Sequence, residues 1–281
     1  MNEWALLIFT VCMQAAIGGI LMLTIFYKKM MKLGTEQAYK AMKLPLLVIA
    51  GFSIVGLAAS FAHLGTPSHA LNAIRNVGTS WMSREILVTS AFIGATCVTA
   101  GLALLQKKVN LLLLIVTSVV GLVDIYCMGA IYSKSLVSGW HSINTFTSFY
   151  GTALVLGPVL TASLLVPVLK GNQSELAQNV VRSAFFISLA GIAIQLIGVA
   201  LFGTAIPEVN MIAGHNAFAS LEGYQTTVAL RWIIEVLGVG VLGYLSLGRA
   251  KKVSLTFAYV ALVVLFLAEG MSRYVFYVLG A

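Results

Sequence analysis

The sequence has 281 residues, of which 59% are hydrophobic and only 9% are charged, and its mean hydropathy is +0.97. Because soluble domains carry about 25% charged residues, this composition excludes a soluble enzyme, a disordered chain and a disulfide-stapled secreted module. The net charge is +8, from 17 basic and 9 acidic residues. In a chain this apolar, a basic excess is typical of loops that face the cytoplasm rather than of nucleic-acid binding. The composition therefore predicts an integral membrane protein that binds no nucleic acid.

Eight apolar runs are long enough to cross a bilayer, for which a helix needs about 20 residues. The runs are continuously apolar and show no alternation, which excludes a closed β-barrel. No basic segment precedes the first run, which is therefore expected to be a retained span and not a cleaved signal. Since the connections are short, residues 1–281 are expected to form a single all-α membrane domain without a soluble part. The predicted spans are 4–27, 44–65, 85–105, 110–132, 146–169, 183–206, 229–247 and 254–279.

The basic residues predict the orientation of the spans. Twelve of them fall in the first, third, fifth and seventh connections, whereas only Glu36 and Glu175 among the acidic residues do. Because basic loops stay in the cytoplasm, both termini are expected on the outer side of the membrane. The five basic residues on that side or at its helix ends are Arg75, Arg84, Lys134, Arg231 and Arg273.

The stretch from 61 to 86 gathers polar groups at one predicted membrane boundary. Gly65 and Pro67 are expected to end a helix at His63, and residues 68–76 can form a short amphipathic segment. Ser83 is expected to cap the next helix and to place Glu85 in its first turn, where the helix dipole favours a carboxylate.

His63, Arg75 and Glu85 therefore bring an imidazole, a guanidinium and a carboxylate to the outer boundary. A quinol that loses two electrons also releases two protons, and an imidazole and a carboxylate are suitable acceptors for them. The alternative is an interfacial loop whose polar groups only satisfy one another.

Two pairs of opposite charge fall inside later spans. Ionisable groups in lipid cost about 2.5–3.5 kcal/mol and face the interior of a bundle. Arg231 and Glu235 are four residues apart, as are Glu269 and Arg273, so that each pair can share one helix face. The pairs are interpreted either as structural ion pairs that fix helix rotation or as functional groups.

Asp124 has no basic residue within one turn on its own helix. It is expected to accept a hydrogen bond from a Ser or Thr hydroxyl of a neighbouring helix. The alternative is a role in a proton path.

The sequence predicts neither a haem nor a metal site. A bis-histidine haem needs paired histidines between helices, and only one of the four histidines falls in a predicted span. The cysteines are isolated, which excludes an iron–sulfur cluster and a structural zinc site. The histidines are His63, His69, His141 and His215, and the cysteines are Cys12, Cys97 and Cys127.

Three blocks of the sequence, residues 3–10 (Glu-Trp-Ala-Leu-Leu-Ile-Phe-Thr), 63–86 and 268–277, carry a resemblance to a known family. The middle block, with His-Leu-Gly-Thr-Pro and Ser-Trp-Met-Ser-Arg-Glu-Ile, is the specific one. The sequence resembles the membrane anchor subunit of bacterial dimethyl sulfoxide reductase, within a wider group of haem-free quinol-oxidising anchors. One departure is Ser68-His69 after the proline, where the family often has an arginine.

The resemblance implies a cofactor-free subunit of the bacterial inner membrane that binds and oxidises menaquinol during anaerobic respiration. It also implies two partners, a four-cluster ferredoxin-like iron–sulfur subunit and a molybdopterin catalytic subunit. The family's quinol-site histidine falls on His63 and its neighbouring carboxylate on Glu85. Related anchors serve reductases of other compounds, so the terminal acceptor does not follow.

Two other functions are compatible with eight spans. A secondary transporter would have two repeated halves and paired broken helices at the midplane, and no convincing repeat is visible. A passive anchor would leave all chemistry to its partners. The gathering of polar groups at one boundary argues against the transporter. Quinol oxidation that survives the loss of every polar residue in 63–85 would favour the passive anchor.

Overall fold

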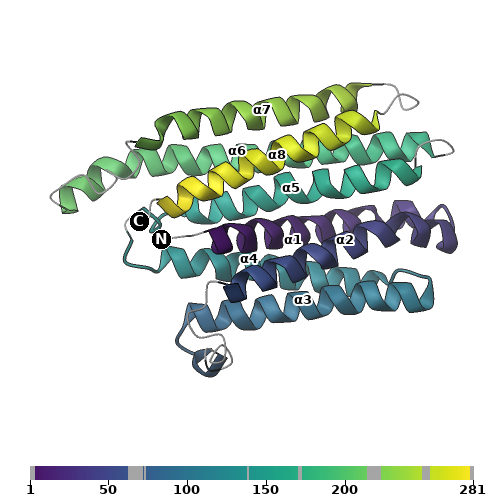
Figure 1. Ribbon diagram of the computed structural model, residues 1–281, viewed down its shortest axis with the longest axis horizontal. Helices are drawn as coiled ribbons and strands as arrows, with labels where there is room; N and C mark the ends of the chain where they lie inside the picture. The colour runs from purple at the N-terminus through teal and green to yellow at the C-terminus, as the bar shows by residue number, and fades with distance from the viewer. Residues whose placement is uncertain are drawn as a thin grey trace.

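The computed structural model describes residues 4–62, 72, 74–137, 139–169, 173–213, 223–248 and 254–278. Within these ranges the chain forms eight long α-helices and no strand (Figure 1). All eight are long and apolar enough to cross a membrane, which confirms the predicted all-α bundle of eight spans. The helices are α1 (Trp4–Met31), α2 (Thr35–Ala62), α3 (Trp81–Gln106), α4 (Leu111–Ser133), α5 (Ile143–Leu169), α6 (Ser174–Ala213), α7 (Gln225–Leu247) and α8 (Leu255–Val278).

Several helices extend beyond the apolar runs that predicted them. α2 starts at Thr35, nearer to α1 than the predicted residue 44, and α6 covers 40 residues. The first turn of α2 is polar, with an ion pair of 2.6 Å between Lys40 Nζ and Glu36 Oε1. Hydropathy detects only the part of a helix that lies in hydrocarbon, whereas good helix formers such as Glu and Lys continue it into the headgroup region.

The turn between α1 and α2 is correspondingly tight. Gly34 has a φ of +93°, a backbone conformation that glycine adopts without steric cost. Its N–H donates to the carbonyl of Met31 at 3.1 Å. This left-handed residue reverses the chain directly after α1, as glycine does at many helix ends.

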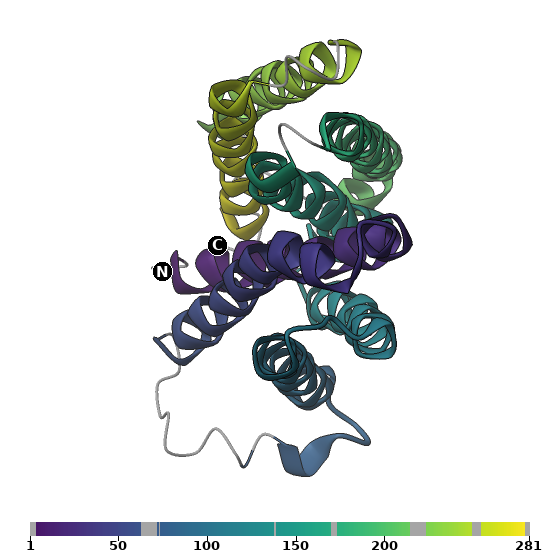
Figure 2. The ribbon, with the colours of Figure 1, turned by 90° about the vertical axis from the view of Figure 1, so that its right-hand side faces the viewer.

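The helices α1 and α5 form the centre of the bundle. In their apolar windows 72% and 78% of the residues are buried, against 44% or less in the other six helices. Viewed from the end of the bundle, α3 and α4 lie to one side of α1, and α6, α7 and α8 lie to the other (Figure 2). The two sides are therefore connected mainly through this central pair.

Glycine allows α1 and α5 to pack closely. A Cβ atom on Gly18 would lie 2.0 Å from the carbonyl oxygen of Ala153, and one on Gly157 would lie 2.1 Å from the carbonyl carbon of Gly18. Small residues at a crossing let two helix backbones approach, which is a common basis of helix association in membranes.

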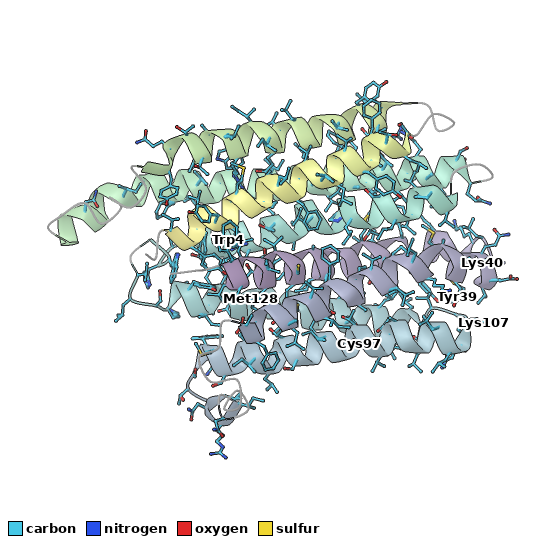
Figure 3. The ribbon with its side chains drawn as sticks, in the orientation of Figure 1. Trp4, Tyr39, Lys40, Cys97, Lys107 and Met128 are labelled. Atoms are coloured by element: carbon cyan, nitrogen blue, oxygen red, sulfur yellow. The ribbon has the colours of Figure 1, made fainter. Side chains whose placement is uncertain are left out.

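The two ends of the bundle differ in charge. Lys40 and Lys107 lie at one end, and Trp4, at the start of α1, lies toward the other (Figure 3). The end of α8 also lies on the Trp4 side (Figure 1). The last turns of α6 project beyond the neighbouring helices at this same end, which is called the terminal end below.

Candidate functional site

The helix α3 begins with a cap that differs from the predicted one. The side chain of Ser80 accepts a hydrogen bond of 3.4 Å from the backbone N–H of Ser83, and the helix starts at Trp81. The expectation that Ser83 caps α3 and that Glu85 lies in its first turn is therefore wrong. Ser80 satisfies the free N–H groups first, because the apolar Trp81 and Met82 can already be helical at a membrane boundary. Glu85 consequently lies deeper along the helix.

Arg84 fixes the chain that leads into α3. Its Nε donates to the carbonyl of Val77 at 2.8 Å, and its Nη2 donates to the carbonyl of Gly78 at 2.7 Å. The guanidinium also lies 4.4 Å from the ring centroid of Trp81, at cation–π distance. From the sequence, Arg84 was assigned a role only in the orientation of the spans. Its spacing of three residues from Trp81, one helical turn, was the available signal.

Glu85, Thr89 and Asp124 form a polar group between α3 and α4. The hydroxyl of Thr89 donates to Asp124 Oδ1 at 2.6 Å, and both residues are buried. This is the interhelical hydroxyl bond expected for Asp124. Glu85 is half-buried, lies one turn before Thr89 on the same helix face, and is within electrostatic range of Asp124. We call these three residues the α3–α4 carboxyl group.

The other two residues of the predicted quinol site are placed differently. His63 lies outside the described residues, directly after the end of α2, which packs against α3. Arg75 is exposed in a short 3₁₀ turn over 74–76. Although Arg75 and Glu85 are both described, no hydrogen bond or ion pair joins them in the structure. The positive charge next to Glu85 along the chain belongs instead to Arg84.

A second polar region lies between α5, α6, α7 and α8 and is completely buried. Glu269 accepts a hydrogen bond of 2.7 Å from the hydroxyl of Thr152 and another of 2.7 Å from Nε2 of Gln195. Arg231 Nη2 donates to Oε1 of Gln195 and forms an ion pair of 3.2 Å with Glu235 Oε2. Each of these five residues is at most 5% exposed. We call Thr152, Gln195, Arg231, Glu235, Glu269 and Arg273 the central network.

The structure thus contains the Arg231–Glu235 ion pair, whereas no direct ion pair joins Glu269 to Arg273, both of which lie in the described part of α8. Arg273 Nη2 donates to Gln14 Oε1 at 2.7 Å and to the Thr152 hydroxyl at 3.4 Å. Its guanidinium also lies 3.8 Å from the ring centroid of Phe149. The hydroxyl of Thr152 therefore separates the two charges, since packing against α1 and α5 gives each a closer partner than its helix neighbour.

The uncharged partners of the charged residues in the central network were not predicted from the sequence. Gln14, Thr152 and Gln195 lie on three different helices and are at most 2% exposed. A glutamine inside an apolar run is a signal, because an amide in lipid needs partners. Hydropathy does not show which helices are neighbours, so the partners were not predictable.

The described residues contain no group of three His, Cys, Asp or Glu side chains that could hold a metal ion. Cys12, Cys97 and Cys127 are all free.

Eight apolar helices, short connections and buried polar groups define the chain as a polytopic membrane subunit of the bacterial inner membrane. Residues 1–279 match the family model described as DMSO reductase anchor subunit (DmsC), and the chain belongs to this family.

Named relatives agree with the family model. The sequence is 28% identical over 278 residues to a chain of the anaerobic dimethyl sulfoxide reductase of Haemophilus influenzae, covering 98% of this sequence and 94% of the relative. It is 35% identical over 169 residues to a chain of the enzyme of the same name in Escherichia coli, covering 58% of each protein. A more distant similarity is to a subunit of the sulfite dehydrogenase of Allochromatium vinosum, at 29% identity over 46% of this sequence and 43% of that protein.

Proposed function

We propose that this anchor subunit oxidises menaquinol at the terminal end of α2 and α3 and passes the electrons to an iron–sulfur subunit with four clusters. A molybdopterin subunit then reduces the terminal acceptor. Membership of the anchor family supports a reductase complex with catalytic and iron–sulfur partners. Dimethyl sulfoxide is the acceptor that the names of two relatives favour.

The α3–α4 carboxyl group is the observation that carries this proposal. Glu85 is half-buried, lies beside the fully buried Asp124 and follows Arg84, which fixes residues 77–78 over the start of α3. A quinol must lose two protons with its two electrons, and a carboxylate reached from the boundary can accept one. His63, next after α2, accepts the other, and Arg75 supplies positive charge that favours the deprotonated intermediate.

The proposed orientation places the terminal end on the outer side of the membrane. Lys40 and Lys107 lie at the opposite end (Figure 3), as expected for a cytoplasmic face. The partner subunit then docks on the outer face, where the last nine residues of α6 extend about 14 Å beyond the span that ends at Thr204. With electrons leaving from this end, the first cluster of the partner lies close to the quinol.

Two substitutions test the quinol site in the assembled complex. His63→Ala and Glu85→Gln are each expected to lower menaquinol-dependent turnover about 10²–10⁴-fold, the usual effect of losing a proton acceptor. Reduction of the acceptor with an artificial soluble donor should stay normal. Glu36→Gln makes the same chemical change at the opposite end of the bundle and should leave both rates unchanged. If both variants assemble and keep menaquinol turnover, the chain is a passive anchor at this site.

Cross-linking tests the docking face. A lysine-directed cross-linker applied to the complex should join the iron–sulfur subunit to Lys134, which is exposed on the terminal side. Cross-links to Lys40 and Lys107 with none to Lys134 would place the partner on the opposite face.

A further inference from the structure

A cavity lies between α5, α6, α7 and α8, away from the α3–α4 carboxyl group. Its volume is about 110 Å³. This is similar in size to the roughly 150 Å³ engineered cavities that bind benzene, so there is space for one compact ring. The lining residues are Asn144, Ser148, Gln195, Val199, Val228, Arg231, Trp232, Ser272 and Val275.

The cavity lies in the terminal half of the membrane and opens toward lipid. Asn144 is the second residue of α5, and Gln195 lies about 14 Å along α6 from the end of its span at Thr204. Val199 lines the cavity and is also 43% exposed on the surface of α6. A hydrophobic molecule in the bilayer can therefore enter from the side, with its tail left in lipid.

The floor of the cavity is polar and buried. Arg231 is 5% exposed and Gln195 is 2% exposed, and the two are hydrogen-bonded to each other. Nε of Arg231 is buried and has no hydrogen-bond partner among the described residues. Arg231 also lines the cavity, so that an acceptor inside it can take a hydrogen bond from the guanidinium.

The charges near the cavity favour a neutral acceptor over an anion. Arg231 is already neutralised by its ion pair with Glu235 at 3.2 Å, and behind them Glu269 and Arg273 add one charge of each sign. An anion would leave this buried region with an excess negative charge, whereas a carbonyl or phenol oxygen adds a hydrogen bond without charge. The valine and tryptophan walls fit the faces of an aromatic ring.

We propose that this cavity is a second binding site for the ring of a quinol or quinone, separate from the oxidation site at His63 and Glu85. The guanidinium of Arg231 donates to a ring oxygen, and the side-chain amides of Asn144 and Gln195 lie beside the same ring. The chain then holds two quinones in its terminal half, one at each side of α1 and α5. This inference rests on the proposed function only for the identity of the ligand class.

Photolabelling with an azido-benzoquinone, a single-ring probe, tests the proposal on the intact complex. Labelled peptides are expected from two places, residues 63–86 and the cavity helices around Ser148, Arg231 and Ser272. Ser148→Leu fills the cavity and should reduce cavity labelling at least tenfold while labelling of 63–86 persists. Ser148→Ala, which removes the hydroxyl without filling space, is the matched control and should label normally.

Val275→Phe fills the cavity from α8 and provides the same test if the first variant does not assemble. Absence of cavity labelling in the unsubstituted complex, or labelling unchanged by either filling variant, would overturn the proposal. Failure of the proposed function is measured separately, as normal menaquinol turnover in Glu85→Gln. If that variant is normal and Ser148→Leu loses turnover, the cavity still binds a quinol and is itself the oxidation site.

Discussion

The α3–α4 carboxyl group and the central network differ in how many donors reach the buried carboxylates of Asp124 and Glu269. In the central network, Glu269 accepts two hydrogen bonds of 2.7 Å and Arg231 is paired with Glu235 at 3.2 Å. In the α3–α4 carboxyl group, Asp124 has a single hydroxyl partner and its second oxygen is unpaired among the described residues. Both regions are inside spans, and both keep buried polar atoms without a hydrogen-bond partner among the described residues, such as Arg231 Nε and Asp124 Oδ2. The carboxylate of Glu269 nevertheless has two donors, where that of Asp124 has one.

The number of donors on a buried carboxylate affects how readily it takes up a proton. A carboxylate held by several donors is stabilised in its charged form and resists protonation, while one with few partners can take up a proton at lower cost. The central network links α5, α6, α7 and α8 by hydrogen bonds and an ion pair, and these contacts stabilise the assembly of that side. Under the proposed function, the single donor on Asp124 makes the uptake of a proton from a quinol less costly there than at Glu269.

The largest expected effect comes from breaking the central network. Glu269→Leu removes the acceptor of Thr152 and Gln195 and leaves two buried arginines with one carboxylate. Removing one partner of a buried charge cluster costs about 3–5 kcal/mol. Chemical unfolding of the detergent-purified complex should show this loss, together with a low yield. Glu36→Leu breaks an exposed pair and should change stability by less than about 1 kcal/mol. Equal effects of the two variants would show that the network has no structural role.

A smaller effect is expected at the α3–α4 carboxyl group. Thr89→Val keeps the side-chain shape and removes the hydroxyl that donates to Asp124 at 2.6 Å. Because hydrogen bonds to charged groups contribute about 1.5–3 kcal/mol, unfolding should become easier by that amount at most. Thr96→Val is the control, since the Thr96 hydroxyl bonds only to the carbonyl of Phe92 within its own helix. If both variants unfold alike, Asp124 does not depend on Thr89.

The fold was largely predictable because the bilayer imposes a simple rule on the chain. Every spanning segment must satisfy its own backbone in lipid, so apolar runs of about 20 residues become helices. The eight spans followed from this rule, and errors were confined to helix ends. The start of α2 at Thr35 and the cap at Ser80 depend on local polar groups, to which a hydropathy window is insensitive.

The sites were less predictable, because they depend on which helices are neighbours. Spacing alone brought Arg231 to Glu235, and the expected hydroxyl partner of Asp124 exists on α3. The separation of Glu269 from Arg273 by Thr152 arises from the packing of α5 against α8, which no pattern within one helix encodes. The quinol roles of His63, Arg75 and Glu85 stay predictions.

The smallest expected effect comes from Arg84, and it concerns binding more than stability. Arg84→Met removes the two hydrogen bonds to the carbonyls of Val77 and Gly78 but leaves Glu85 and Asp124 in place. Water replaces these bonds at the boundary, so the unfolding free energy should change by less than about 1 kcal/mol.

Arg84 holds residues 77–78 against the start of α3. If these residues cover the quinol, weakening their attachment by about 1 kcal/mol lowers the fraction of binding-competent complex about fivefold. The KM for menaquinol should then rise about fivefold while kcat is nearly unchanged. Lys134→Met removes another basic residue of the terminal side and should leave KM alone. A loss of kcat with unchanged KM would instead assign Arg84 to the chemical step, and the α3–α4 carboxyl group would then include a positive charge of its own.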